Sequence, residues 1–153
     1  MPIKANLKII EKNKEMEEKI YTYRIWEASK NTGFESLDHH HKKFVDVINN
    51  LVDILNDKKE ESEVLDIFHK LLYYAEIYFI DEELAYQKSD YKELKRHQEE
   101  HKDFIAEISK FRKEFKANDK TVCVRMMKYL DIWYKNHILG EDSDAAKGIE
   151  KKK

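Results

Sequence analysis

The chain has 153 residues, which is enough for one domain with a sizeable core and too few to suggest two. It contains only three glycines and one proline, and 39% of its residues are charged, so the turns of a sandwich or barrel are scarce. The 29 basic and 31 acidic residues are interspersed, which argues against a nucleic-acid-binding surface. The composition therefore favours an all-α protein of long amphipathic helices.

Cys123 is the only cysteine, so the chain can form neither an internal disulfide nor a thiolate metal site. No apolar run approaches the roughly 20 residues that span a bilayer. The N-terminus lacks the unbroken apolar core of a signal peptide. We therefore expect a soluble cytoplasmic protein with no membrane partner.

An N-terminal extension, residues 1–25, has weak amphipathic character and is followed by a large apolar anchor, Trp26. The first helix is predicted over residues 36–56, because apolar side chains and His41 recur there at alternating steps of three and four. Ser36 stands where an N-cap would accept a hydrogen bond from the first turn.

The second helix is predicted over residues 62–87. Toward its end, the inward side carries Tyr78, Glu82 and Tyr86, which follow one another at steps of four. A carboxylate on this otherwise apolar side is costly to bury, so an inward Glu82 suggests a compensating cation. The alternative is that Glu82 turns outward beside Glu83.

The third helix, predicted over residues 91–116, contains the motif HQEEH. This spacing places His97 and His101 on one helix face, within reach of a single ion. The fourth helix is predicted over residues 121–139, with Gly140 as its C-terminal stop.

Four helices joined by short polar connections predict an up-down-up-down antiparallel four-helix bundle. We assign this bundle to residues 26–143 and expect residues 144–153 to form a charged C-terminal tail.

Four of the seven histidines lie on the predicted inward faces: His41, His97, His101 and His137. One histidine on an apolar face is more often a core residue than a ligand, but four on three helices favour a metal site. Asp142 follows His137 by five residues, about 500° round an unbroken helix, so the two can meet only if the chain folds back at Gly140. Read alone, this acidic stretch is a solvated tail.

Nitrogen and oxygen ligands without a thiolate fit iron, manganese or zinc. Glu82 and Asp142 are two carboxylates able to bridge, and such a pair fits a dinuclear centre better than a mononuclear one.

Several motifs occur in an order that resembles the hemerythrin family, and within it the single-domain bacteriohemerythrins. The resemblance runs from Trp26 to about Asp142 and rests on the stretches GFESLDHHHKKF, YFIDEELAY, HQEEH and WYKNHILGED. It implies a four-helix bundle that holds two non-haem irons, linked by two carboxylates and an oxo or hydroxo bridge. Dioxygen would bind end-on to one of them.

The resemblance also implies a role for each candidate ligand. The coordinatively full iron would be held by three histidines: His97, His101 and His137. Glu82 and Asp142 would bridge the two irons. His41 would bind the second iron, which keeps an open position for oxygen.

The sequence departs from the family at the second iron, because Tyr78 stands where the family has a ligand histidine. Three other histidines do not fill the gap on helical geometry. His39 and His40 are turned off the stripe of His41 by about 100° per residue, and His69 lies about 180° from Tyr78 round the same helix.

Three interpretations of Tyr78 stay open. Its deprotonated phenol could bind Fe(III), which would stabilise the ferric state and weaken reversible oxygen carriage. The phenol could instead lie unligated in the pocket, or the site could have decayed and left a core tyrosine, although six other ligand positions are retained. Tyr86, in place of the family's pocket methionine, is predicted over the open face of the second metal.

The sequence therefore predicts a non-haem di-iron protein that binds dioxygen or another small oxidant, for oxygen binding, storage or sensing, at a site with an altered second-iron ligand. The alternative is a di-iron oxidoreductase acting on peroxide or nitric oxide. A third interpretation is a sensory or interaction module, in which the N-terminal extension transmits the state of the metal site.

Overall fold

A computed structural model describes residues 7, 11, 22–56, 61–116 and 120–151 of the chain. These residues are mainly helical, and none of them lies in a strand. The α-helices are α2 (Glu35–Leu55), α3 (Val64–Tyr74), α4 (Ile80–Lys88), α5 (Leu94–Glu114), α6 (Lys120–Trp133) and α7 (Ser143–Lys151). Two π-helical segments, Ala75–Phe79 and Tyr134–Asp142, and two 3₁₀ turns, Ala28–Lys30 and Glu61–Glu63, complete the set.

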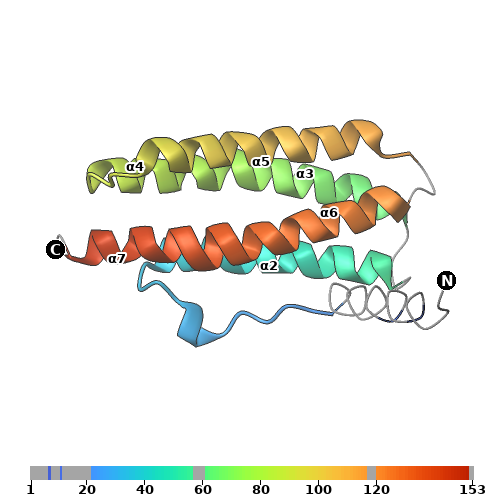
Figure 1. The fold of residues 1–153 in the computed structure, drawn as a ribbon, viewed down its shortest axis with the longest axis horizontal. Coiled ribbons are helices and arrows are strands. Elements are labelled where there is room, and N and C mark those ends of the chain that lie inside the picture. The colour runs from blue at the N-terminus through green and yellow to red at the C-terminus, as the bar shows by residue number, and fades with distance from the viewer. Residues whose placement is uncertain (1–6, 8–10, 12–21, 57–60, 117–119, 152–153) are drawn as a thin grey trace.

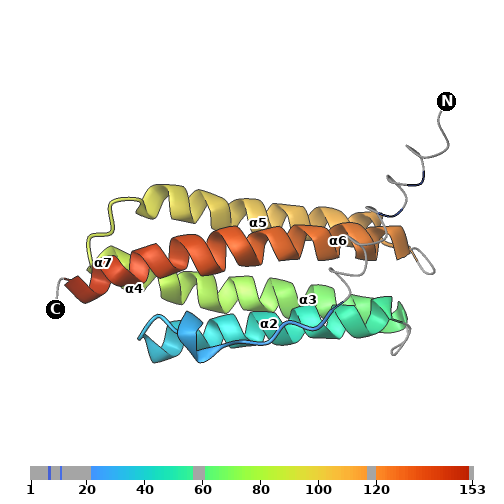
Figure 2. The same ribbon diagram turned by 60° about the horizontal axis from the view of Figure 1, so that its bottom comes forward.

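The helices form four long rods that lie side by side (Figure 1). One π-helical segment joins α3 to α4 in a single rod, and the other joins α6 to α7. Helix α2 packs against α3 and α6, and α5 packs against α3, α4 and α6. The rods therefore surround one core and alternate in direction (Figure 2), which confirms the predicted all-α up-down-up-down bundle.

Helix α2 begins one residue before the predicted cap. Its N-cap is Phe34, which has an extended backbone and makes no side-chain capping bond, so the prediction for Ser36 is wrong. Asp38 in the first turn instead accepts hydrogen bonds from the backbone N–H of Thr32, at 2.7 Å, and from the Thr32 hydroxyl, at 2.9 Å. These bonds fix the path by which the chain enters the helix.

The fourth rod does not stop at Gly140, which corrects the sequence prediction. A glycine stop takes a left-handed backbone, and among the described glycines only Gly33 has a positive φ, of 92°. The helix instead widens to π geometry over Tyr134–Asp142 and continues as α7. Ala145 and Ala146, at the start of the predicted charged tail, are buried.

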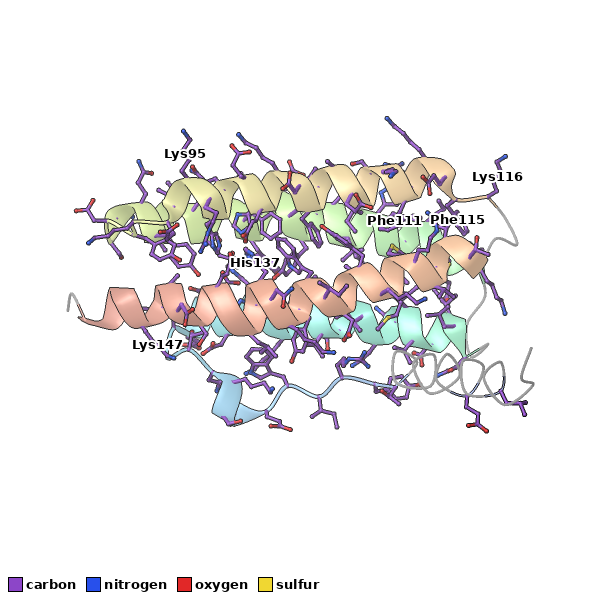
Figure 3. All side chains as sticks on the ribbon, viewed as in Figure 1. Lys95, Phe111, Phe115, Lys116, His137 and Lys147 are labelled. Atoms are coloured by element: carbon purple, nitrogen blue, oxygen red, sulfur yellow. The ribbon has the colours of Figure 1, made fainter. Side chains whose placement is uncertain are left out.

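Much of the apolar core lies in the half of the bundle where α5 ends and α6 begins, and the core extends to Phe79 and Trp133 beside the histidine cluster. Phe111 and Phe115 lie toward that end, whereas His137 lies nearer the middle, between the rods (Figure 3). Side chains of this core with no exposed surface include Phe44, Ile48, Leu51, Phe68, Phe104, Ile108 and Met126. Burying each such side chain stabilises the fold by about 1.5–3 kcal/mol, so this half does not depend on a metal for its cohesion.

Residues 22–34 run along the outside of α2 (Figure 1). The backbone N–H and C=O of Arg24 both bond the side-chain amide of Asn49, at 2.8 and 2.9 Å, and its guanidinium forms an ion pair with Asp131 at 2.9 Å. Most of the predicted N-terminal extension, residues 1–6, 8–10 and 12–21, lies outside the described residues. Within the described residues, no helix is both long and apolar enough to cross a membrane.

Candidate metal centre

Six of the predicted ligands meet in the interior of the bundle. The helices α2, α4 and α5 and the π-helical segment Tyr134–Asp142 contribute His41, Glu82, His97, His101, His137 and Asp142, and all six side chains are buried. Their donor atoms form two compact groups. The first group contains Glu82 with His97, His101 and His137, and the second contains His41, Glu82 and Asp142.

The first group is a three-histidine cluster facing a carboxylate. The Nε2 atoms of His101 and His137 are 3.2 Å apart, and Nε2 of His101 is 3.3 Å from Oε2 of Glu82. Nε2 of His97 lies 3.9 Å from the same oxygen. Three imidazoles thus direct nitrogen atoms at one point, which is the arrangement of ligands around a single ion.

Asp142 connects the two groups through its two oxygens. Oδ2 is 2.9 Å from Nε2 of His41, whereas Oδ1 is 3.1 Å from Nε2 of His97 and accepts a hydrogen bond from the Tyr86 hydroxyl at 3.1 Å. One oxygen therefore faces each group. This is the placement that a bridging carboxylate requires, and it comes from a residue that lies in a helix rather than in a tail.

The π-helical segment explains how Asp142 reaches the interior. In a π-helix the hydrogen bonds run between residues five apart, so residues 137 and 142 lie one above the other on the same face. An α-helix would turn Asp142 away, and the predicted chain reversal at Gly140 is not needed. No propensity in the stretch HILGED indicates a π-helix, so only the functional pairing of His137 and Asp142 could have suggested one.

Both carboxylate oxygens of Glu82 are buried and have no hydrogen-bond partner, and neither ring nitrogen of His97 has one. Buried polar groups are hydrogen-bonded in the great majority of cases, and an unpaired buried carboxylate is very costly. A cation between these atoms would compensate both groups at once. The donor set therefore fits a metal centre.

Neighbouring histidines keep the two candidate carboxylate ligands, Glu82 and Asp142, ionised. Burial alone would raise the pKa of Glu82, but the imidazoles of His101, His40 and His97 outweigh it and hold the pKa well below its ordinary value. The pKa of Asp142 is likewise lowered, by His137, His41 and His97, against the effects of burial and Glu82. Both bridging candidates therefore carry a negative charge, which attracts a cation.

The pKa values of two ligand histidines, His137 and His97, are shifted in opposite directions. Burial and two neighbouring imidazoles lower the pKa of His137 to about 4, so this ligand is neutral and ready to bind metal. For His97, the carboxylates of Asp142 and Glu82 outweigh burial and raise the pKa to about 9. A metal must therefore displace a proton from His97.

Aromatic rings hold several imidazoles in place. Phe79 stacks on His101 with ring centroids 3.9 Å apart, and Trp133 stacks on His137 at 4.0 Å. Trp26 lies 5.6 Å from the ring of His41, which gives the predicted anchor a place against the site. These ring contacts fix the directions of the donor atoms.

Outer carboxylates face the remaining nitrogens of the three-histidine cluster. Nδ1 of His137 is hydrogen-bonded to Glu100 at 3.0 Å and lies 3.6 Å from Glu141, and Nδ1 of His101 lies 3.8 Å from Glu83. Carboxylates in such positions orient ligand imidazoles and raise their basicity. Sequence reasoning did not assign a role to these carboxylates. Glu100 and Glu83 contact histidines on other helices, and Glu141 lies beyond the predicted end of the fourth helix.

Tyr78 is half-buried and lies in the π-helical segment Ala75–Phe79. Its ring stacks on His40, with centroids 3.9 Å apart and an interplanar angle of 16°. Binding of a metal by the Tyr78 phenol stays a prediction. Exposed positions for His39 and His69 agree with the helical geometry inferred from the sequence.

His40 corrects that geometry. It was predicted to lie off the inward stripe, yet only 5% of its surface is exposed, and its Nδ1 is 3.8 Å from Oε1 of Glu82. The reason is that α2 packs against helices on two sides, so its buried arc is wider than one stripe. His41 faces the centre, and His40 faces α4.

Tyr86 is 1% exposed, and its hydroxyl bonds Asp142. Burial and the nearby carboxylates of Asp142 and Glu82 raise its pKa above its ordinary value, so the phenol stays protonated and acts as a donor. With His40 and Glu82 it lines a cavity of about 60 Å³ between the start of α2 and α4. That volume is enough for a few water-sized molecules.

A four-helix bundle whose core holds two donor groups that share a carboxylate defines a histidine- and carboxylate-rich metal-binding protein. Comparison with known families is specific: the model of the hemerythrin HHE cation-binding domain matches residues 32–147. The chain belongs to the hemerythrin family.

Curated relatives agree with this assignment. The chain is 29% identical over 119 residues to a bacteriohemerythrin of Pseudomonas aeruginosa, covering 78% of this chain and 76% of that protein. It is 27% identical over 124 residues to a bacteriohemerythrin of Clostridium acetobutylicum, covering 78% of this chain and 96% of that one.

Proposed function

We propose that the protein binds dioxygen at a carboxylate-bridged pair of non-haem irons with an oxo or hydroxo bridge and an altered second-iron ligand. The observation that carries this proposal is the sharing of Glu82 between two buried donor groups. Asp142 supports it, since its two oxygens face different groups. Family membership supports iron as the metal.

The two metal positions differ in what they can do. Three histidines and the carboxylates would saturate the first position, leaving no place there for a small ligand. The second position has one histidine in its compact group and adjoins the cavity lined by Glu82 and Tyr86. A small ligand would therefore enter at the second position. The iron pair would supply the electrons for reversible binding.

Tyr86 has a defined role in this proposal. Its hydroxyl holds Oδ1 of Asp142 and so fixes the orientation of that carboxylate, while its ring stands edge-on to His97 with centroids 5.0 Å apart. Because its phenol keeps its proton, Tyr86 also presents a polar edge to an otherwise largely apolar cavity. It would keep the Asp142 carboxylate in place beside a bound ligand and keep bulk water out.

The test is to reduce the iron-loaded protein anaerobically and then admit dioxygen. We expect a visible absorption band that appears with oxygen and disappears when oxygen is removed. Immediate conversion to the ferric form without a reversible band would favour the alternative, an oxidoreductase acting on peroxide or nitric oxide. Turnover of either compound by the reduced protein would then be measured directly.

A further inference from the structure

The second metal position has fewer nitrogen donors than the first. His41 is the only histidine in its compact group, whereas three histidines belong to the other group. The residue that the family pattern assigns to a further histidine is Tyr78 in this chain. Another histidine nitrogen, Nδ1 of His40, lies close to Glu82 in the structure.

The bridging candidates show which atoms belong to which metal. Oε2 of Glu82 faces His101 and His97, and Oδ1 of Asp142 also faces His97. The opposite oxygens point the other way: Oδ2 of Asp142 faces His41, and Oε1 of Glu82 faces Nδ1 of His40. His40 therefore stands on the side of the second metal, facing the carboxylate oxygen that is left for it.

The distance between Nδ1 of His40 and Oε1 of Glu82 is too long for a hydrogen bond but suits two ligands of one metal ion. Nδ1 of His40 and Oε1 of Glu82 are 3.8 Å apart, beyond hydrogen-bonding range. Two metal–ligand bonds of about 2.0–2.1 Å each span up to about 4.2 Å, so one ion fits between them. Both atoms are buried, and neither has a hydrogen-bond partner.

The surroundings of His40 hold its ring in this direction. Tyr78 stacks nearly parallel on the imidazole, and Nε2 on the far side of the ring lies 3.9 Å from a carboxylate oxygen of Asp81. Nδ1 is the ring nitrogen that faces Glu82, and it is therefore the one placed to bind a metal. Tyr78 itself also lines an open groove between α2 and α3, together with Asp46.

We propose that His40 supplies the nitrogen ligand that Tyr78 cannot, and that it joins His41, Glu82 and Asp142 at the second iron. Nδ1 of His40 faces Glu82 but lies outside the compact group of these three residues, so its ring must move toward them when the iron binds. Tyr78 is then a positioning residue, which acts through the ring of His40. This proposal rests on the di-iron function proposed above. The second iron then keeps a histidine nitrogen as its ligand, but this nitrogen comes from α2 and not from the segment that contains Tyr78.

The exchange has a functional consequence. An anionic phenolate stabilises Fe(III), but a neutral imidazole leaves the diferrous state accessible. With His40 as ligand, the altered site therefore keeps the nitrogen donor that reversible oxygen binding needs. The tyrosine in the ligand position does not convert the protein into a ferric enzyme.

The experiment compares His40→Ala with His39→Ala, a neighbouring histidine that is exposed. Iron per chain and the Mössbauer spectrum of protein loaded with enriched iron are measured. We expect about one iron instead of about two in His40→Ala and the loss of one of two iron signals, whereas His39→Ala keeps both. His40→Gln, which keeps the side-chain volume, should lose the same iron, and free imidazole should restore it in His40→Ala.

A third variant separates the two donors. Tyr78→Phe keeps the ring that stacks on His40 and removes the phenol, so we expect both irons and an unchanged visible spectrum. Loss of an iron, or of a phenolate-to-iron absorption band, in this variant would assign the ligand to Tyr78 and overturn the proposal.

The di-iron function and the role of His40 are tested by different samples. Fewer than two irons in the unmodified protein would overturn the di-iron function itself. Two irons in the unmodified protein, with both signals unchanged in His40→Ala and His40→Gln, would overturn only the role of His40.

Discussion

At the scale of single residues, Glu82 is the ligand candidate that belongs to both donor groups, and neither of its oxygens has a hydrogen-bond partner. We predict that Glu82→Gln loses both irons. The amide removes the negative charge that offsets two cations, and it also loses one metal-binding oxygen. Elemental analysis of the purified variant gives the result directly.

Glu83→Gln is the matched control for Glu82. Glu83 follows Glu82 directly in α4 but is partly exposed, and it lies 3.8 Å from the outer nitrogen of His101. This variant should keep about two irons per chain. Equal iron loss in both variants would mean that charge near the site, and not ligation by Glu82, holds the metal.

His97 and His137 make the stability of the metal-free protein depend on pH in opposite directions. Between pH 6.5 and about 9 the folded protein keeps a proton on His97 that the unfolded chain releases, so stability falls as pH rises. Between pH 6.5 and about 4, His137 is protonated in the unfolded chain but stays neutral in the folded protein, so stability falls as pH falls. These two histidines place a maximum melting temperature near pH 6.5, and we predict that the raised pKa of Glu100, about 7, shifts this maximum to lower pH.

Thermal unfolding of the metal-free protein across this pH range measures the effect. In His97→Gln the fall above pH 6.5 should be smaller. A melting temperature of the unmodified protein that rises steadily from pH 6.5 to 9 would contradict the assignment of a raised pKa to His97.

At the scale of elements, the π-helical segment Tyr134–Asp142 is what places His137 and Asp142 on one face. It predicts that Gly140→Ala is tolerated, because the added Cβ meets only the carbonyl oxygen of Lys135 at 3.6 Å, an ordinary contact. Glycine in a helix is less stable than alanine by about 0.5–1 kcal/mol, so we expect the variant to be more stable by that amount. Urea unfolding provides the measurement.

Gly33→Ala is the control for this substitution, since its backbone has a φ of 92° that disfavours a side chain. That change should destabilise the protein by about 1–2 kcal/mol. If Gly140→Ala were destabilised equally, Gly140 would be acting as a helix stop after all.

The sequence was informative about elements with a regular period and less so about their irregular parts. Apolar residues and His41 at steps of three and four predicted α2 to within one residue at each end. The π-helical segments could not be predicted, because their hydrogen-bond register depends on packing and not on residue propensity. His40 was misplaced for a related reason, since a single stripe omits the second neighbour of a helix in a bundle.

At the scale of the whole molecule, the apolar core reaches the site and extends beyond it toward the end of the bundle where Phe111 and Phe115 lie (Figure 3). We predict that removing iron lowers the melting temperature without abolishing the helical fold. The metal-free site leaves buried carboxylate oxygens uncompensated, while the burial of apolar side chains such as Phe68 and Met126 involves no ligand. Circular dichroism before and after chelation gives both quantities.

Unfolding at room temperature on chelation would contradict the expectation that the apolar core holds the fold together without metal. A melting temperature unaffected by iron would show that the metal does not bind the folded state in preference to the unfolded chain.

The most direct test of the account is the iron content of the protein purified after growth with ample iron. Two donor groups joined by Glu82 and Asp142 predict about two irons per chain. A value near zero would contradict a metal centre at these residues, and a value near one in the unmodified protein would contradict the dinuclear site.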